Sequence, residues 1–243
     1  MPTVLILGAA SDMAVAIAQK FAATGYDLQL AARKVERLQP LQSDISIRTG
    51  RTVSLLEFDA LNFGSHHTFF HALAQKPDVV ICVFGYLGDN ETARNSWQES
   101  EKIIHTNYTG AVSILNVVGQ YFAAQKKGVI AGISSVAGER GRQSNYIYGS
   151  AKAGFTAYLS GMRNRLFHEG VHVASIQPGF VYTRMTENLT LPPLLTAQPA
   201  QVADTVYAAV TKKKNVVYVK WFWRWIMLII KSIPEFIFKK LKL

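Results

Sequence analysis

Short apolar runs alternate with longer stretches of helical periodicity along most of this chain, and the alternation constrains its fold more than any other feature. Seven of the runs are rich in Val, Ile and Leu and predict strands at residues 4–7, 27–31, 53–57, 79–83, 129–133, 172–176 and 216–219. Continuous apolar strands separated by helices are typical of a parallel sheet that is covered on both faces. The sequence therefore predicts an α/β fold.

Helices are expected in the intervals, notably at residues 14–24, 97–124, 148–169 and 199–212. Residues 184–200 contain three prolines among leucines, and consecutive prolines stop regular structure, so an irregular lid or substrate loop is expected there. We predict a single doubly wound (Rossmann) domain with a seven-stranded parallel sheet over residues 1–220. A basic, aromatic tail with an amphipathic helix is predicted over residues 221–243.

Composition narrows the class of protein. The chain has 243 residues, of which 49% are hydrophobic and 17% are charged, and this excludes a disordered protein. Its single cysteine, Cys82, lies in an apolar run and is expected to be a buried, inert thiol, which fits a reducing cytoplasm. The N-terminus has neither the basic region nor the apolar length of a secretory signal, so a cytoplasmic protein is expected.

Positive charge is concentrated at the C-terminal end. The formal net charge is +10, and residues 212–243 hold nine Lys or Arg and one acid, Glu235, whereas the rest of the chain is nearly balanced. A protein that binds nucleic acid through its folded domain would carry a basic patch on that domain, outside residues 212–243. Nucleic acid is therefore not expected as a partner, and the asymmetry indicates a basic tail.

A turn after the first predicted strand is the candidate phosphate-binding site. The segment Gly-Ala-Ala-Ser-Asp-Met-Ala begins at Gly8 and opens the first helix, where backbone N–H groups and the helix dipole favour a pyrophosphate. Cofactor-binding roles are predicted for Gly8, Ser11, Asp12 and Met13. The glycine pattern is incomplete, and the alternative is that Gly8 only makes a tight turn while Asp12 caps the helix.

Arg33 follows the second predicted strand, where the adenosine ribose of a dinucleotide would lie. A carboxylate at this position binds the ribose 2′-OH of NAD, whereas the cations Arg33 and Lys34 suit the 2′-phosphate of NADP. NADP(H) is therefore favoured and NAD(H) stays open. The alternative is that both cations belong to a solvated surface.

Tyr148 and Lys152 form the strongest local signal. They are four residues apart, so on a helix they share one face, and a nearby ammonium favours the phenolate over the phenol. A tyrosine helped in this way becomes an effective acid or base near neutral pH. Ser135 precedes Tyr148 at the end of a predicted strand. The alternative for the tyrosine and lysine alone is an amphipathic helix with a surface lysine.

Ser135, Tyr148 and Lys152 together resemble the catalytic residues of the short-chain dehydrogenase/reductase family, and the resemblance spans residues 3 to about 219. It implies that the serine hydroxyl orients the substrate oxygen and that the tyrosine transfers the proton. The lysine would bind the nicotinamide ribose and lower the pKa of the tyrosine. Asn107 resembles the family's helix asparagine, which holds a water molecule in the proton relay, and completes a candidate catalytic set.

Other segments resemble the parts of this family that bind NAD(P). The segment Pro-Gly-Phe-Val-Tyr-Thr resembles the one after the sixth strand, whose backbone and threonine hold the nicotinamide carboxamide; it gives cofactor-binding roles to Pro178, Gly179, Val181 and Thr183. Asp59 resembles the acid that meets the adenine amino group. Gly85 stands at the end of a Val-Phe-Gly segment where the family commonly has Asn-Asn-Ala-Gly. This segment and the glycine turn depart from the family pattern.

Three histidines raise the question of a metal. His67 and His71 have helical spacing and His66 is adjacent, but no further ligand set accompanies them. A catalytic zinc needs a further protein ligand and an open position. We therefore predict a hydrophilic helix edge and no metal.

The tail holds three of the four tryptophans of the chain. At about 100° per residue, Lys220, Arg224, Lys231 and Glu235 fall within one arc of a helix, and most other positions are apolar. The longest uncharged run, residues 225–230, is too short for a bilayer crossing, which needs about 20 apolar residues.

Two placements of this helix stay open. Tryptophan prefers the headgroup boundary and lysine attracts anionic lipid, so the helix is expected to rest on the inner face of the cytoplasmic membrane. The alternative is a helix packed against the enzyme body or in a dimer interface. In either placement Pro234 is expected to bend or end the helix.

Within the family the chain resembles the keto-sugar reductases that partner decaprenylphosphoryl-ribose 2-epimerase, in segments 84–89, 107–109, 134–140, 233–234 and 238–241. This resemblance implies reduction of a keto-sugar on a polyprenyl phosphate during cell envelope biosynthesis, after a flavin oxidase partner has acted. Two alternatives stay open: a reductase of another lipid or small carbonyl compound, and a non-catalytic nucleotide-sensing module. The family also implies a homo-oligomer formed through long helices.

Overall fold

The central strands are buried on both faces, which is why the sequence shows them as continuous apolar runs. All five residues of β1 (Thr3–Leu7) are buried. The chain is described here by a computed structural model that covers residues 1–187 and 189–241. Its main sheet has seven parallel strands in the order β3-β2-β1-β4-β5-β6-β9, and they confirm the predicted α/β fold.

Each observed strand of this sheet lies within two residues of its predicted bounds. The remaining strands are β2 (Asp27–Ala32), β3 (Val53–Glu57), β4 (Val79–Cys82), β5 (Gly128–Ile133), β6 (Val171–Pro178) and β9 (Val216–Val219). Two further short strands, β7 (Phe180–Val181) and β8 (Thr196–Ala197), pair with each other outside the sheet. Sequence analysis did not predict this pair, because two-residue strands carry no periodicity.

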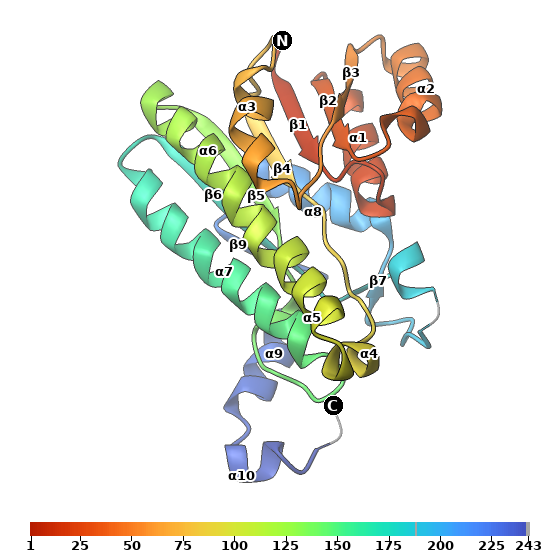
Figure 1. Ribbon diagram of the computed structural model, residues 1–243, viewed down its shortest axis with the longest axis vertical. Coiled ribbons are helices and arrows are strands. Elements are labelled where there is room, and N and C mark those ends of the chain that lie inside the picture. Colours follow the sequence, from red (N-terminus) through yellow and green to blue (C-terminus); the bar gives the residue numbers. More distant parts are fainter. Residues whose placement is uncertain (188, 242–243) are drawn as a thin grey trace.

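Helices cover both faces of the sheet (Figure 1). Val4 and Ile6 of β1 belong to the core on the face covered by α1 (Asp12–Ala23) and α8 (Pro199–Thr211), which pack against each other. Leu5 and Leu7 belong to the core on the opposite face of the sheet, which a second layer of helices covers. The helices of this second layer are α3 (His66–His71), α5 (Trp97–Ile104), α6 (Gly110–Gln125) and α7 (Tyr146–Phe167). The outer helices are α2 (Gln39–Thr49) and α4 (Asn90–Asn95).

The strand order reverses between β1 and β4. From β1 the chain proceeds outward through β2 to β3, then crosses back to place β4 on the other side of β1. In open parallel sheets a ligand crevice forms at such a reversal, beyond the carboxyl ends of the strands. The glycine turn after β1 lies at this end of the sheet.

The predicted helix over residues 97–124 is continuous but not uniform. α5 leads into a π-helical turn at His105–Thr109, and this turn leads directly into α6. Single π-turns inside α-helices occur frequently at functional sites. The irregular loop predicted at residues 184–200 contains a short 3₁₀ turn, Arg184–Thr186, and β8.

The tail forms two helices that extend away from the sheet (Figure 1). α9 (Trp223–Ser232) and α10 (Glu235–Phe238) are separated by Ile233, whose backbone is extended, and by Pro234, so the predicted break at the proline is confirmed. No helix among residues 1–187 and 189–241 has both the length and the apolar character that a bilayer crossing requires.

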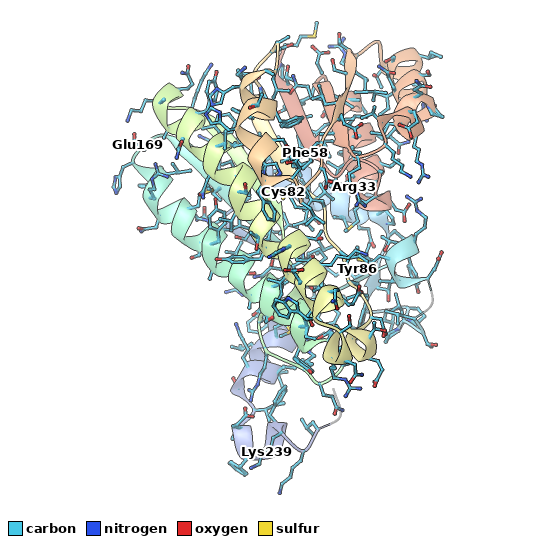
Figure 2. All side chains as sticks on the ribbon, in the orientation of Figure 1. Arg33, Phe58, Cys82, Tyr86, Glu169 and Lys239 are labelled. Atoms are coloured by element: carbon cyan, nitrogen blue, oxygen red, sulfur yellow. The ribbon has the colours of Figure 1, made fainter. Side chains whose placement is uncertain are left out.

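One face of α9 is packed into the protein. Trp223 and Met227 are buried and form a small core with Val136, whereas Trp225 and Ile229 on the other side are 53% and 66% exposed. The packed placement therefore holds for one side of the helix. The other side is an apolar surface, and the exposed Lys239 follows directly after α10 (Figure 2).

The prediction of a hydrophilic histidine edge is wrong for His66. Its side chain is 1% exposed, and its ring nitrogens meet the Ser113 hydroxyl at 2.8 Å and the Asp59 carbonyl at 3.0 Å. Burial lowers the pKa of His66, and Asp59 acts in the opposite direction. At the start of α3 this position faces α6, whereas His67 and His71 are exposed and share the outer side.

Candidate active site

Ser135 stands at the carboxyl end of β5, just beyond the buried Ser134. Its backbone is extended, and its hydroxyl accepts a hydrogen bond from the Ala137 N–H at 3.1 Å, which caps the short turn Val136–Gly138. Ser134 instead turns toward α7, where its hydroxyl lies 2.6 Å from that of Thr156. Because adjacent strand residues point in opposite directions, the second serine of the pair is presented to the end of the sheet.

Tyr148 and Lys152 lie one turn apart near the start of α7. Lys152 is 4% exposed, and its Nζ donates a hydrogen bond to the Ile133 carbonyl at 3.0 Å. The same Nζ lies 5.8 Å from the centre of the Tyr148 ring. Lys152 is thus tied to the last residue of β5, two residues before Ser135, and the spacing argument from the sequence is confirmed.

Burial controls the pKa values of this pair. It raises the pKa of Tyr148 to about 12, and a side-chain hydrogen bond with Ser135 acts in the opposite direction. Burial also lowers the pKa of Lys152 to about 8. The pKa of Tyr148 is therefore raised overall and not lowered as expected from the sequence, because desolvation of the phenolate dominates.

Asn107 lies in the π-helical turn and is 1% exposed. Its Nδ2 donates hydrogen bonds to the carbonyls of Tyr86, at 2.6 Å, and Ile103, at 2.8 Å, while its Oδ1 accepts from the Tyr86 N–H. A Cβ on Gly85 would lie 2.9 Å from Asn107 Oδ1 and 3.4 Å from Lys152 Nζ. Asn107 therefore fixes the loop after β4, and the missing side chain of Gly85 lets asparagine and lysine converge.

The glycine turn is shaped by Gly8. Its φ of +90° disfavours other residues, and a Cβ there would lie 2.6 Å from the backbone nitrogen of Phe84. The N–H groups of Gly8 and Ala9 both reach the Ala31 carbonyl, which holds the turn against β2. The turn thus keeps the backbone close to the switch point although its later glycines are replaced.

Asp12 does not cap α1. The cap is Ser11, whose Oγ accepts a hydrogen bond from the Ala14 N–H at 3.2 Å. Asp12 instead forms an ion pair with Arg184 at 3.0 Å and accepts a further bond from the Arg184 backbone N–H, while the Arg184 guanidinium donates to the Ala10 carbonyl. Asp12 is the first helical residue, one position past the cap. Its carboxylate connects the glycine turn to the loop after β7.

Arg33 and Asp59 follow the next two strands. Arg33, labelled in Figure 2, is exposed directly after β2. Asp59 is half-buried after β3, where its Oδ1 accepts from the Leu61 N–H at 3.0 Å. Both residues lie at the same end of the sheet as Gly8, which is the geometry expected of an adenosine site.

A cavity opens at the other side of the switch point. Its empty volume is about 890 Å³ including the open mouth. It is lined by nine of the residues predicted from the sequence: Met13, Gly85, Ser135, Tyr148, Lys152, Pro178, Gly179, Val181 and Thr183. Asn107 lies behind Gly85, and the lining excludes Gly8, Ser11, Asp12, Arg33 and Asp59, which sit toward the adenosine side.

Sequence analysis missed part of this lining. Arg142 and Asn145 come from the segment before α7, and Trp223 comes from α9. Trp223 is 3% exposed and donates a hydrogen bond to the Leu195 carbonyl at 3.2 Å, and its ring lies against Gly179. The surplus of tryptophan in the tail was a signal, but its contact with residues more than forty positions away was not visible in the sequence.

The residues present fit a nicotinamide dinucleotide. Gly8 packs without a Cβ against the backbone of Phe84 and so shapes the turn that opens α1, and Gly85 leaves space in front of Lys152. Cys82 lies beneath the site but is 1% exposed, and burial raises the pKa of its thiol to about 12. It is therefore an inert part of the core, as predicted.

Known proteins resemble this chain along its whole length. The sequence pattern of the family described as short chain dehydrogenase matches residues 2–193. An uncharacterized oxidoreductase of Mycobacterium tuberculosis is 32% identical over 241 residues, which cover 98% of this chain and 96% of the relative. A 3-oxoacyl-[acyl-carrier-protein] reductase of Synechocystis is 33% identical over 136 residues, which cover 53% of this chain and 55% of the relative.

A solved structure supports the same assignment of the fold. The short-chain dehydrogenase of Sphingobium yanoikuyae in complex with NADPH has a TM-score of 0.83 at 23% identity, and 97% of each chain is covered. The match over most of the sequence agrees with the parallel sheet, the glycine turn and the convergence of serine, tyrosine and lysine. The chain belongs to the short-chain dehydrogenase family of NAD(P)-dependent oxidoreductases.

Proposed function

We propose that the protein reduces a ketone to a secondary alcohol, with NADPH as the hydride donor. The convergence of Ser135, Tyr148 and Lys152 on one cavity carries this proposal. At neutral pH the phenol of Tyr148 holds its proton and can donate it to a carbonyl oxygen. Tyr148 lines the cavity together with Ser135 and Lys152, so donor, orienting hydroxyl and ammonium meet one substrate.

Each side chain has a distinct task in this reaction. Bound NADPH supplies the hydride that reaches the carbonyl carbon. Ser135 holds the carbonyl oxygen by a hydrogen bond, and Tyr148 Oη transfers its proton to that oxygen. Lys152, which burial keeps at a pKa of about 8, carries the positive charge that stabilises the phenolate left on Tyr148.

The preference for NADPH rests on Arg33. Its guanidinium is exposed at the carboxyl end of β2 and forms no ion pair within residues 1–187 and 189–241. A fixed guanidinium binds a phosphate through two hydrogen bonds, whereas a ribose hydroxyl gives it no charged partner. NADPH-bound relatives by fold include the Sphingobium dehydrogenase.

The direct test combines a panel of ketones with the Tyr148→Phe variant. The panel spans keto-sugars, long-chain ketones and small cyclic ketones, and consumption of NADPH is followed by absorbance. We expect turnover of at least one class by the wild type and a loss of at least about a thousandfold in Tyr148→Phe, because the proton donor is gone. Binding of NADPH, followed by its fluorescence, should be nearly unchanged. NADPH binding without turnover of any ketone would favour a nucleotide-sensing module.

The finer proposal is a keto-sugar linked to a polyprenyl phosphate. Its support is the resemblance to keto-sugar reductases in segments 84–89 and 134–140 and the apolar tail beside the cavity. In this assignment a flavin oxidase forms the ketone before reduction. Turnover of long-chain ketones without a sugar, and of no keto-sugar, would replace it with another lipid ketone.

We also propose that the outer side of the tail rests on an anionic membrane surface. Trp221, Trp225, Leu228 and Ile229 are 74%, 53%, 51% and 66% exposed, and further exposed lysines stand at Lys231 in α9 and at Lys239 and Lys240 just after α10. Aromatic and basic residues together favour the headgroup boundary. A surface-bound enzyme would meet a lipid-linked substrate at high local concentration.

This membrane proposal is tested with vesicles that contain phosphatidylglycerol. The double variant Trp225→Ser, Ile229→Ser keeps the buried Trp223 and Met227 and should lose most of the wild-type cosedimentation. Ile47→Ser is the matched control, because Ile47 is 84% exposed on the distant α2. Equal cosedimentation of wild type and double variant would contradict the proposal.

A further inference from the structure

The substrate end of the cavity carries an unusual arginine. Arg142 and Lys152 are the two charged side chains among the described residues that line the cavity, and no carboxylate of those residues lines it. Lys152 is bound to the Ile133 carbonyl near the catalytic tyrosine. Arg142 lies on the segment before α7, on the side where Trp223 and Asn145 also line the cavity.

Arg142 is poorly satisfied within the protein. Its Nε is buried and has no hydrogen-bond partner among the described residues, and its Nη2 meets the thioether of Met227 at 3.2 Å. A thioether is a weak acceptor. Burial lowers the pKa of Arg142, yet a guanidinium keeps its charge at neutral pH, so a positive charge is desolvated here with little compensation.

The nearest carboxylate makes no hydrogen bond to Arg142. Glu139 acts to raise the pKa of Arg142, but its Oε2 pairs with Lys231 of α9 at 2.7 Å, and its buried Oε1 has no hydrogen-bond partner among the described residues. The Nε of Arg142 is therefore left without an acceptor from the described residues, and a ligand in the cavity can supply one.

A neighbouring amide points to the same place. Asn145 lines the cavity at the start of α7, and its Oδ1 is buried without a partner among the described residues. Its amide N–H groups can donate to ligand oxygens, whereas the free Oδ1 can accept from a hydroxyl group of the ligand. The positive end of the α7 dipole adds to the potential at this position.

We propose that Arg142, with Asn145, is the subsite that binds the phosphate group of a substrate whose ketone is reduced at Tyr148. The guanidinium fork of Arg142 matches two phosphate oxygens, and the apolar part of the cavity lining, which includes Trp223, Phe180 and Leu189, receives the chain attached to the phosphate. This inference rests on the proposed ketone reduction and names its substrate class: a ketone that carries both a phosphate and an apolar chain.

The test measures binding without turnover. The protein is first saturated with NADP⁺, so that the nucleotide site is filled, and titrated by calorimetry with octyl phosphate, inorganic phosphate and the neutral octyl glucoside. For octyl phosphate we expect Arg142→Gln to bind about tenfold to a hundredfold more weakly than the wild type, as for the loss of a charged hydrogen bond. Octyl glucoside should bind both proteins equally.

Two further variants sharpen the outcome. Arg48→Gln makes the same change at an exposed arginine on α2 and should behave as the wild type. Arg142→Lys keeps the charge but loses the fork, so its affinity should lie between those of wild type and Arg142→Gln. If Arg142→Gln binds octyl phosphate as tightly as the wild type, the subsite is refuted.

The remaining comparison separates the source of the anion. The wild type should bind octyl phosphate more tightly than inorganic phosphate, and equal affinities would refute the assignment of a chain-bearing phosphate. Since no step is catalysed, a lack of ketone turnover would overturn the proposed function and leave these titrations intact. Turnover of ketones combined with no effect of Arg142→Gln would overturn the subsite alone.

Discussion

The two ends of the cavity are built in different ways. The catalytic end is formed by the last residues of β5 and the first turns of α7, where Ser135, Tyr148 and Lys152 are fixed by regular secondary structure. The substrate end is formed by the segment before α7 and by α9, which are some ninety residues apart and meet through hydrogen bonds from Arg140 to carbonyls at the end of α9. Chemistry is thus encoded locally, and specificity is encoded by long-range contacts.

The largest expected effect concerns the charge at the catalytic end. Lys152 has a pKa of about 8 in the folded protein and an ordinary value of 10.5 in the unfolded chain. Between these values the unfolded chain holds more protons, so stability should rise with pH from about 8 to about 10.5, by roughly 3 kcal/mol in total. Lys152→Met should lack this rise.

Urea unfolding at about pH 7 and pH 10 measures the difference. The raised pKa values of Cys82, above about pH 9, and of Tyr148, above about pH 10, act in the opposite direction, because the unfolded groups lose their protons first. Both groups are present in the wild type and in Lys152→Met, so the difference between the two proteins reports on Lys152. Parallel pH dependences of wild type and Lys152→Met would show that the ammonium of Lys152 is not desolvated.

Removal of the Trp223 side chain probes the substrate end of the cavity. Trp223→Ala should lower kcat/KM for the ketone by about tenfold, because Trp223 lines the substrate side of the cavity. The affinity for NADPH should stay within about twofold of the wild type. Steady-state kinetics with fluorescence titration of NADPH separates the two quantities, and a matching loss in both would break the division between the ends.

The adenosine side offers a weaker perturbation. Arg33→Ala should reduce the affinity for NADPH by about tenfold and leave that for NADH unchanged, because the 2′-phosphate loses a charged partner. Parallel titrations of both coenzymes measure the ratio, and Lys34→Ala serves as a neighbouring control. An unchanged ratio in Arg33→Ala would return Arg33 to the solvated surface.

The smallest effect is expected at the ion pair between the glycine turn and the loop after β7. Asp12→Asn removes the charge that meets Arg184, but the arginine is 70% exposed, so the affinity for NADPH should change only about two- to threefold. The change should shrink as salt is raised. A loss of NADPH affinity as large as that of Arg33→Ala would mean that the ion pair holds the site closed and is not only a weak surface contact.

The sequence predicted the sheet and the catalytic end because both depend on spacing. The seven apolar runs marked the strands, and the four-residue interval of Tyr148 and Lys152 placed both residues on one face of α7. The pKa of Tyr148 was predicted in the wrong direction, since burial is a tertiary property. His66 was misplaced for the same reason.

The substrate end was out of reach of such reasoning. Arg142 and Trp223 belong to no motif, and their proximity depends on the path of the chain between α7 and α9. The sequence also did not show that Ser11, rather than Asp12, caps α1, because both residue types cap helices well. In the structure Asp12 instead pairs with Arg184, which is 172 residues further along the chain.

One helix, α9, faces two environments at once. Trp223 looks into the cavity, and Trp225, two positions later, looks outward. If a partner binds the outer side of α9 and shifts the helix, the affinity of the cavity for its substrate changes. By thermodynamic linkage, substrate bound in the cavity then changes the affinity for that partner by the same factor. A tether or fusion attached to this end of the chain would therefore register the arrival of substrate.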